Sequence, residues 1–244
     1  MHLPGRRVEW FDSIDSTMIR AAALAREGRP HGTIVGADEQ TAGVGRQGRS
    51  WHSKKGEGLY VSVVLRLPVE ARALPVVMLA LGLAAQEAIA QTASLAPDLR
   101  WPNDVLIGGR KCAGILAQLE GDAIIAGIGV NVSQIGFPPG LATPATSLLR
   151  EGARVSREEL LAVLAGAVDR LCSVLVNDGA PSILRMFEAS SSYARGRRVR
   201  VEQEGGEIMG VTRGLDESGF LMVEQNGGKL TKILTGGVRA ASAE

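Results

Sequence analysis

Residues 100–133, RWPNDVLIGGRKCAGILAQLEGDAIIAGIGVNVS, decide how this chain is expected to fold. Two short turns, Gly108-Gly109 and Gly121-Asp122, separate the apolar runs of this stretch. Turns of this kind favour tight hairpins, because glycine, asparagine and aspartate accept the positive φ angles that they require. The stretch therefore predicts a three-stranded antiparallel meander.

The first hairpin brings two opposite charges together if its two glycines are the central turn residues. Leu106 then pairs with Lys111, Asp104 pairs with Ala113, and the four side chains share one face of the sheet. Asp104 lies diagonally opposite Lys111, within reach of its long side chain. The pair is either a surface ion pair worth under about 1 kcal/mol or part of a site. The apolar sequence around it favours a site.

The rest of the chain alternates between strand and helix patterns. Strands are predicted for TIVGADEQ (33–40) and GLYVSVVLRL (58–67), which enter and leave a glycine-rich loop. Helices are predicted over 12–28, 74–91, 156–179 and 181–190. From about Arg195, short alternating strands with glycine, aspartate and asparagine turns are typical of a small β-barrel. We predict an α+β chain with a large domain at 1–194 and a small β domain at 195–244.

Helix ends carry their own signals. The helix over 12–28 is expected to start at an Asp15 or Ser16 N-cap and to stop at Gly28. Its apolar face is expected to consist of Ile19, Ala22, Ala23 and Leu24. Ser156-x-x-Glu159 forms a capping box at the start of the helix over 156–179.

Composition limits the classes of function. A net charge of +1 provides no global attraction to nucleic acid. The histidines His2, His31 and His52 and the separate Cys112 and Cys172 match no zinc-site spacing, and both thiols are expected to be buried and reduced.

The start of the chain, MHLPGRRVEWF, lacks a signal-peptide apolar run. The apolar segment 74–91 includes Gln86 and Glu87, so a core helix is expected there and not a membrane span. A cytoplasmic location is expected.

The glycine-rich loop is EQTAGVGRQGRSWHS, residues 39–53. Its Gly43-x-Gly45-x-x-Gly48 spacing matches the dinucleotide fingerprint, but it leads into a strand, whereas the fingerprint opens a helix. The spacing is also too short for a P-loop. The loop is either a solvated basic turn or a segment that approaches a ligand closely and pairs Arg46 and Arg49 with phosphate.

Taken together, these residues resemble those of the biotin protein ligase family. The matching blocks are Asp15-Ser16-Thr17, Gln40-Thr41-x-Gly43-x-Gly45-Arg46-x-Gly48-Arg49-x-Trp51, Trp101-Pro102-Asn103-Asp104, Arg110-Lys111-x-x-Gly114-Ile115-Leu116, Gly127-Ile128-Gly129-Val130-Asn131 and Ala145-Thr146-Ser147-Leu148. Their order and spacing follow the family over nearly the whole chain.

The resemblance implies a catalytic biotin- and ATP-binding domain at 1–194, with a mixed sheet and flanking helices related to class II aminoacyl-tRNA synthetases. It implies an SH3-like β-barrel at 195–244. The implied reaction has two steps: biotin and ATP form biotinyl-5′-AMP and pyrophosphate, and a lysine of a biotin carboxyl carrier protein then takes the biotinyl group. Mg²⁺ is expected to accompany ATP, and no residue of the chain is assigned as a metal ligand.

The resemblance also implies roles for individual residues. The catalytic set is Lys111, Arg46 and Asp104, with Asp104 expected to orient the acceptor lysine or assist its loss of a proton. The biotin-binding set is Ser16, Thr17, Met18, Gln40, Gly43, Val44, Gly45, Arg46, Lys111 and Gly114. The nucleotide-binding set is Arg46, Arg49, Trp51, Asn103, Lys111 and Asn131. Physically, a carboxylate that attacks a phosphate needs such cations, and a lid that excludes water protects the acyl-adenylate.

This chain departs from the family pattern in two residues. Val44 stands where the loop commonly has arginine, and Arg100 stands where lysine is frequent. The loss of the first arginine is expected to weaken ligand retention without abolishing activity. Because the chain begins close to the catalytic domain, operator binding is not expected.

Other functions stay open at this level. A lipoate or octanoate ligase shares the fold and the activation of a carboxylate, although the polar Ser16, Thr17 and Gln40 favour a ureido head. A nucleic-acid-binding module is suggested by Arg195, Arg197, Arg198 and Arg200. Because Arg198 and Arg200 alternate with Val199 and Val201, a solvated strand face is the favoured explanation, and a docking surface for an acidic carrier domain is a second alternative. Monomer and homodimer are both compatible with the sequence.

Overall fold

The larger sheet of the chain has seven strands, and it carries the blocks described above. The computed structural model describes residues 1, 3–203 and 206–241. The sheet order is β1-β2-β3-β7-β6-β5-β4. The strands are β1 (Val8–Phe11), β2 (Thr33–Ala37), β3 (Gly58–Leu65), β4 (Asp98–Arg100), β5 (Asp104–Ile107), β6 (Arg110–Glu120) and β7 (Ala123–Asn131). Only β1 and β2 pair in parallel, so the sheet is mixed, as predicted.

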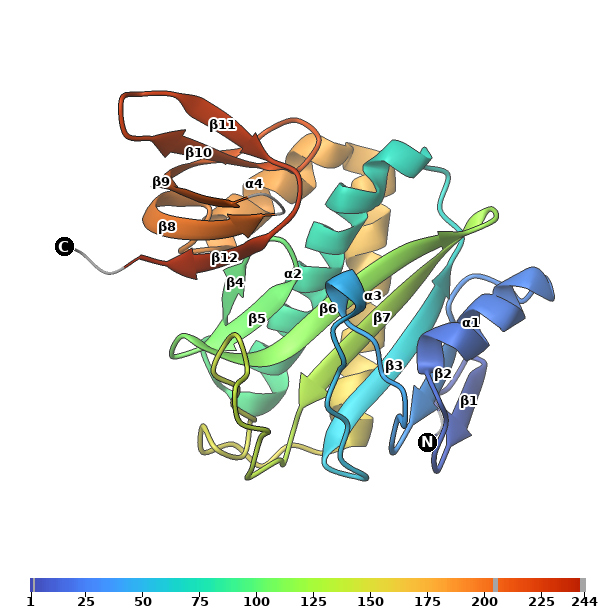
Figure 1. The fold of residues 1–244 in the computed structure, drawn as a ribbon. Coiled ribbons are helices and arrows are strands. Elements are labelled where there is room, and N and C mark those ends of the chain that lie inside the picture. Colours follow the sequence, from blue (N-terminus) through green and yellow to red (C-terminus); the bar gives the residue numbers. More distant parts are fainter. Residues whose placement is uncertain (2, 204–205, 242–244) are drawn as a thin grey trace.

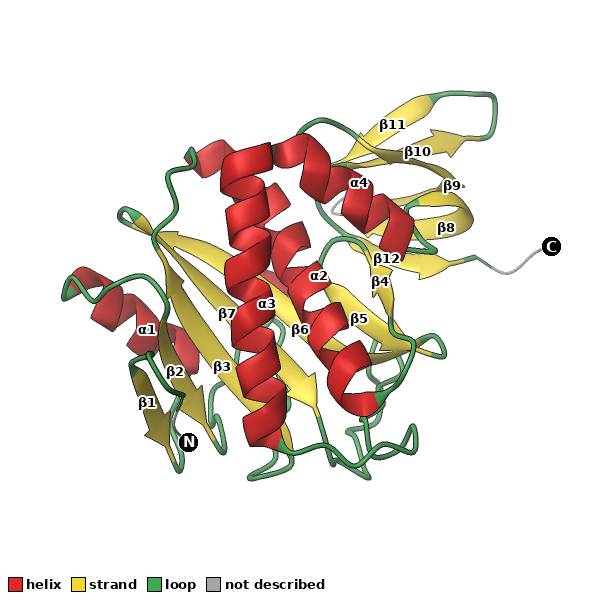
Figure 2. Ribbon diagram, turned by 180° about the vertical axis from the view of Figure 1, so that it is seen from behind, coloured by secondary structure: helices red, strands yellow, loops and turns green. Residues whose placement is uncertain are grey.

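Helices cover the two faces of this sheet unequally. The long helices α2 (Leu74–Ala93) and α3 (Arg157–Asp178) lie across one face, with α4 (Ala180–Ser190) beside them (Figure 2). The opposite face carries α1 (Thr17–Arg26) at one side and the glycine-rich loop in front of β6 and β7 (Figure 1). The second face is therefore the open one, where a ligand has room.

Strand β3 shows how the sequence separates these faces. All eight of its residues are buried, as expected for a central strand covered on both sides. Leu59, Val61, Val63 and Leu65 join the main core under α2 and α3. Val64 belongs to a smaller core under α1, which contains Met18, Ala21, Ala22, Leu24, Ala25, Val35, Ala123 and Ile125. The alternation of side chains along one strand thus supports two separate cores.

The predicted meander has four strands and a different register. The short strand β4 precedes it, and both predicted turns are present. Leu106 pairs with Lys111 as predicted, but Ala113 pairs with Val105 and Asp104 pairs with Gly114. Cys112 is an extra residue in β6, that is, a β-bulge, which shifts every pair beyond it by one. The predicted pairing of Asp104 with Ala113 is therefore wrong, and Gly114 replaces Ala113 beside Asp104.

The helix signals are confirmed with one exception. Ser156 Oγ accepts a hydrogen bond from the backbone N–H of Glu159, and α3 starts at the next residue after Ser156. Ser16 is the N-cap of α1, and Gly28 follows its end with φ of 76°. Ile19 is 55% exposed, so its assignment to the buried face of α1 is wrong. It lies on the outer side of a helix whose apolar face is built from alanine and leucine.

Helix α2 is a core helix with the composition of a membrane span. An 18-residue window of the segment Ala71–Ala93 has a mean hydropathy of 1.8, so the segment is long and apolar enough to cross a bilayer even though it includes Gln86 and Glu87. However, 61% of its most apolar window is buried inside the protein, against α3, α4 and the sheet. Its hydrophobicity is thus explained by its central position between the sheet and α3.

The C-terminal segment forms a second, antiparallel sheet of five strands. Its order is β11-β10-β9-β8-β12, and the strands are β8 (Arg195–Gln203), β9 (Gly206–Leu215), β10 (Leu221–Gln225), β11 (Leu230–Ile233) and β12 (Gly237–Ala240). Among the described residues, two of the four arginines of its first strand form ion pairs: Arg195 with Glu188 at 3.0 Å and Arg200 with Glu207 at 3.5 Å. Arg197 stacks on Tyr193, 4.7 Å from the ring centroid. These contacts favour a solvated strand face over an anion-binding surface.

Both cysteines are buried free thiols, as predicted. Burial raises the pKa of Cys112 to about 12 and the pKa of Cys172 to about 11. Because the thiolate is the reactive form, neither side chain is suited to nucleophilic chemistry near neutral pH.

Candidate active site

Three glycines form the floor of a cavity on the open face of the large sheet. Gly114 and Gly129 are cross-strand partners on β6 and β7. A Cβ atom at Gly114 or Gly129 would lie 2.7 or 2.6 Å from the ring of Trp51, and one at Gly127 would lie 2.7 Å from Met18 Sδ. The absence of side chains at these positions lets Trp51 and Met18 approach the strand backbone closely.

A buried cluster of one carboxylate and two cations lies at the edge of this floor. Asp104 Oδ1 is 2.5 Å from Lys111 Nζ, and Asp104 Oδ2 accepts a hydrogen bond of 2.5 Å from Arg100 Nη2. Arg100 also donates to Thr143 Oγ1 at 2.8 Å. The predicted contact of Asp104 with Lys111 is therefore present, because the bulge at Cys112 returns Lys111 to the same face as Gly114.

The charges around Asp104 decide its protonation. Burial alone would raise the pKa of its carboxyl group, but the positive charges of Lys111 and Arg100, with their hydrogen bonds, outweigh burial and hold the pKa below its usual range. Asp104 is therefore a stable anion whose two oxygens already have partners. Such a group orients cations well and accepts protons poorly.

A polar cluster lies at the N-terminus of α1. Gln40 Oε1 accepts hydrogen bonds from the backbone N–H of Thr17 at 2.8 Å and from Thr17 Oγ1 at 3.0 Å. Thr17 Oγ1 also lies 2.8 Å from Ser62 Oγ of β3, and Ser16 is buried beside it. The arrangement offers hydroxyl and amide groups, and no charge, to a neutral polar ligand at one end of the cavity.

The segment Gly43–Trp51, which we call the lid, is a short hairpin over the cavity. Its two legs are joined by backbone hydrogen bonds from Trp51 to Gly43 at 2.8 Å and from Gly45 to Arg49 at 2.6 Å. Gln47, at the tip, has φ of 57°, a left-handed conformation. The Val44 side chain is 50% exposed. The lid is thus an ordered hairpin and not a simple turn.

The two arginines of the lid differ in their surroundings. Arg46 is half-buried, and its Nη1 donates to Asn103 Oδ1 at 3.3 Å. Burial lowers the pKa of the Arg46 guanidinium, although Asp104 counteracts this effect. Arg49 is exposed at the rim of the cavity. Only Arg46 is held in place by its neighbours among the described residues.

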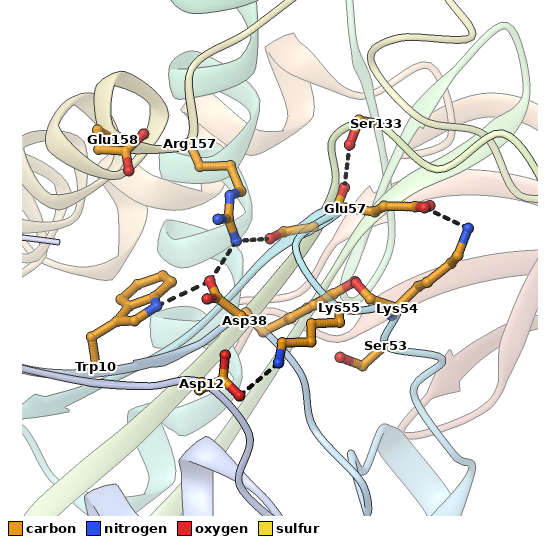
Figure 3. A network of polar contacts seen from close by, with 12 residues as sticks. Trp10, Asp12, Asp38, Ser53, Lys54, Lys55, Glu57, Ser133, Arg157 and Glu158 are labelled. Atoms are coloured by element: carbon orange, nitrogen blue, oxygen red, sulfur yellow. Dashed lines mark hydrogen bonds and ion pairs between the residues drawn. The ribbon is translucent and has the colours of Figure 1, made fainter.

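A polar network fixes the chain where the C-terminal leg of the lid returns to the sheet (Figure 3). The Asp38 carboxylate accepts hydrogen bonds from Trp10 Nε1 at 3.1 Å and from Arg157 Nη1 at 2.8 Å, and its backbone carbonyl accepts one from Gly56 at 3.0 Å. Further contacts tie the same leg to its neighbours: Lys55 to Asp12, Lys54 to Glu57, and Ser133 to Glu57 (Figure 3). These contacts anchor the chain directly after the lid.

The segment 144–151 holds Lys111 from the other side. The backbone N–H of Lys111 donates to Pro144 at 2.8 Å, and Thr146 donates back to the Lys111 carbonyl at 2.9 Å. Arg110 Nε and Nη2 donate hydrogen bonds to the Glu151 carboxylate at 3.1 and 2.8 Å. Lys111 thus has its backbone fixed by two chain segments, while its side chain projects to Asp104.

Asn103 and Asn131 are both anchored within the protein. Asn103 Nδ2 donates to the carbonyl of Ile115 at 3.0 Å, which fixes the turn before β5. Asn131 Nδ2 donates to the carbonyl of Thr146 at 2.9 Å. The Asn131 amide therefore holds the segment 144–151 in place, a contact that its sequence position did not reveal.

Nearly all of the predicted site residues line one cavity of ≈ 230 Å³. Of the predicted site residues, the cavity wall includes Ser16, Thr17, Met18, Gln40, Val44, Gly45, Arg46, Arg49, Trp51, Asn103, Asp104, Lys111, Gly114 and Asn131. Gly43 is buried at the base of the lid, near Gln40 Nε2. The structure therefore brings together residues that are up to 115 positions apart, from Ser16 to Asn131.

Several wall residues were not predicted as site residues. They include Gly127, Gly129, Arg100, Thr143, Phe137 and the segment 236–239 of the small sheet. Glycines at alternate positions of β7 are the one local signal, because they leave one face of a strand bare. The contribution of the small sheet has no local signal at all.

The arrangement suits an attack by one anion on another. One end of the cavity is neutral and polar, at Thr17 and Gln40, whereas the other end carries Lys111, Arg46 and the exposed Arg49. The described residues contain no group of three or more histidine, cysteine, aspartate or glutamate side chains that could hold a metal ion. Charge stabilisation by the chain itself therefore rests on these cations.

Two family descriptions match this chain. "Biotin/lipoate A/B protein ligase family" matches residues 10–134, and "Biotin protein ligase C terminal domain" matches residues 195–238. The first match contains α1, the lid and Lys111, and the second contains β8 to β11 and the first half of β12.

Individual proteins are similar to the chain over most of its length. The bifunctional ligase/repressor BirA of Bacillus subtilis is 33% identical over 92% of this chain and 71% of its own. The biotin--[acetyl-CoA-carboxylase] ligase of Mycobacterium tuberculosis is 34% identical over 85% of this chain and 78% of its own. The biotin protein ligase of Aquifex aeolicus in complex with biotin and ATP has a TM-score of 0.85 and 31% identity, over 96% of this chain and 99% of that one.

Proposed function

Because this chain belongs to the biotin/lipoate A/B protein ligase family, we infer that it is an ATP-dependent biotin–protein ligase. It joins biotin and ATP to biotinyl-5′-AMP with release of pyrophosphate, and it then forms an amide between biotin and a lysine of acetyl-CoA carboxylase. The observation that carries this inference is the Lys111–Asp104–Arg100 cluster under the lid, in a fold that matches a ligase with bound biotin and ATP. The protein substrate contains a biotin carboxyl carrier domain.

In the first step, a biotin carboxylate oxygen attacks the α-phosphorus of ATP, and pyrophosphate leaves. We propose that Lys111 stabilises the negative charge that builds up on these oxygens. Arg46 and Arg49 are proposed to bind the phosphates. The cluster supports this role because Asp104 keeps Lys111 aimed into the cavity. Trp51 is proposed to contact the nucleotide, and the Thr17–Gln40 cluster is proposed to bind the ureido head of biotin.

In the second step, the amine of the acceptor lysine attacks the acyl carbon, AMP leaves, and the amine loses a proton. Asp104 was expected to orient that lysine or to assist the proton loss. Its lowered pKa and its two cationic partners favour a positioning role, in which it holds Lys111 and Arg100. The proton is then left to solvent or to a phosphate oxygen of the leaving AMP.

Mg²⁺ is assigned to the substrate, as the complex of ATP with the ion. Among the residues that the structure describes, Asp104 provides the one carboxylate in the cavity wall, and its oxygens contact Lys111 and Arg100. Such a site does not suit a resident divalent cation. We propose that the phosphates of ATP carry the ion into the cavity.

We further propose that residues 1–194 form the catalytic domain and residues 195–244 a small SH3-like β domain. A cytoplasmic location fits the reduced thiols and the carboxylase substrate. The ion pairs of Arg195 and Arg200 argue against a nucleic-acid-binding surface on β8. Homodimer formation stays a prediction that sedimentation velocity tests directly.

The direct test is transfer of labelled biotin to a carrier domain. The purified chain, with ATP, Mg²⁺ and labelled biotin, should label one lysine of the domain, and no label should appear without ATP. A correctly folded enzyme that labels no carrier would contradict the inference. Titration calorimetry with biotin and with lipoate distinguishes a biotin ligase from a lipoate ligase of the same fold. A biotin ligase should bind biotin more tightly, because lipoate has no ureido group to interact with Gln40.

Arg46→Gly should release the intermediate faster. The variant loses the contact with Asn103, and glycine makes the closed lid entropically costlier. We expect the rate constant for loss of biotinyl-5′-AMP to rise by about 10-fold or more, since a hydrogen bond from a charged group contributes about 1.5–3 kcal/mol. Val44→Arg should slow the loss by restoring a cation at the cavity rim. Wild-type release rates in both variants, measured by chase with unlabelled biotin, would contradict the lid assignment.

A further inference from the structure

The lid forms hydrogen bonds with a turn of the small C-terminal sheet. Thr235 lies in the turn between β11 and β12, and its Oγ1 is 3.3 Å from Arg46 Nη2 and 3.3 Å from Gln47 Nε2. Both nitrogens donate, so one hydroxyl oxygen accepts hydrogen bonds from the two residues at the tip of the lid. The contact joins parts of the chain that are 189 residues apart.

Arg46 uses its two terminal nitrogens to bridge the two sheets. Nη1 donates to Asn103 in the turn before β5, and Nη2 donates to Thr235. Asn103 is itself fixed to Ile115 by hydrogen bonds of 3.0 and 2.9 Å. The planar guanidinium is therefore held from both sides, a geometry that lysine could not reproduce.

The β11–β12 turn is shaped to present Thr235. Gln203 Nε2 donates to the Thr235 carbonyl at 3.0 Å. Gly236 has φ of 135°, and a Cβ atom there would lie 2.5 Å from the carbonyl oxygen of Glu202. The turn thus packs backbone to backbone against β8, which leaves the Thr235 hydroxyl directed at the lid.

We propose that Thr235 is a latch that keeps the lid closed, so that the small domain sets how long the enzyme retains the acyl-adenylate. The segment 236–239 lines the same cavity as Lys111 and Trp51, which places the latch at the mouth of the site. The role of Thr235 in retaining the intermediate rests on the function proposed above. Its role in keeping the lid closed is independent of that function. Thr235 is a positioning residue, because it acts through Arg46 and Gln47.

The first test uses trypsin on the ligand-free protein, because Arg46 and Arg49 are both cleavage sites within the lid. Proteolysis of a segment that opens and closes rapidly follows the population of the open form. Thr235→Val keeps the shape of the side chain and removes the hydroxyl. We expect cleavage after Arg46 and Arg49, quantified by mass spectrometry, to become about fivefold faster, the factor that one net hydrogen bond typically provides.

Thr231→Val is the matched control. Its hydroxyl lies in the same small sheet and accepts a hydrogen bond from Gln225 at 2.7 Å, away from the lid. The control should cleave at the wild-type rate. Equal acceleration in both variants would mean general loosening of the small domain and would overturn the latch. Unchanged cleavage in Thr235→Val would overturn it as well.

The second test measures the loss of labelled biotinyl-5′-AMP in a chase. Thr235→Val should lose it about fivefold faster than Thr231→Val. A double variant with Gln47→Met should lose it no faster than Thr235→Val alone, because both changes remove the same contact. Faster lid cleavage with an unchanged loss of intermediate would confirm the contact and overturn its role in retention. A wild-type protein that forms no biotinyl-5′-AMP would contradict the proposed function, while the trypsin result still decides the latch.

Discussion

Lys111→Met should lower the rate of biotinyl-5′-AMP formation by about a hundred- to a thousandfold. Methionine keeps the length of the side chain and removes the charge that we assign to the reacting oxygens. Loss of one preorganised group of this kind commonly costs that factor. Exchange of labelled pyrophosphate into ATP, with biotin present, measures the first step without a carrier.

Lys55→Met is the matched control for that experiment. Lys55 Nζ pairs with Asp12 at 2.6 Å on the exposed side of the anchoring network (Figure 3). It is a lysine–aspartate pair like that of Lys111, but it lies outside the cavity wall. Its loss should change the exchange rate less than twofold, as expected for a surface ion pair. A Lys111→Met protein that is folded and exchanges at more than a tenth of the wild-type rate would contradict the assignment.

Asp104→Asn should destabilise the protein by about 3–5 kcal/mol at pH 7, the usual cost of removing one partner from a buried ionic cluster. The substitution leaves Arg100 and Lys111 without their anion, and the Arg100 side chain is only 8% exposed. Biotin-dependent pyrophosphate exchange should fall too, because Lys111 loses the contact that aims it. Denaturant unfolding measures the first effect.

The destabilisation caused by Asp104→Asn should depend on pH in a defined direction. The folded pKa of Asp104 lies below its unfolded value, so its contribution to stability is complete above about pH 4. The contribution disappears as the pH falls through the lower, folded pKa. The difference in unfolding free energy between wild type and Asp104→Asn should therefore be constant from pH 5 to 8 and shrink below about pH 4.

Asp122→Asn is the control for stability. Asp122 also pairs with an arginine, Arg66, but its side chain is 82% exposed. Its loss should cost less than about 1 kcal/mol. Equal destabilisation by the two substitutions, or a difference for Asp104→Asn that grows below pH 4, would contradict the account of Asp104 as a buried anion between two cations.

Local patterns in the sequence determined the elements and most of the site. The continuous apolar run of β3, the Ser156 cap of α3 and the glycine turns of the meander each specify a short segment through backbone geometry alone. The contact between Asp104 and Lys111 followed from one tight turn, because a hairpin couples residues that are close in sequence. The ordered blocks around them were sufficient to indicate the family.

Only the tertiary structure decided the details that make the cavity. The bulge at Cys112 changes which residue lies beside Asp104, and no turn residue marks it. Gly114 and Gly129 lack side chains, and the ring of Trp51 from the lid packs against the strand backbone at these two positions. The contact of Arg46 with Thr235 joins the lid of the large sheet to the small sheet. A local pattern encodes periodicity and turns, whereas such contacts between distant segments depend on how the whole chain packs, and they therefore become visible only once both sheets are in place.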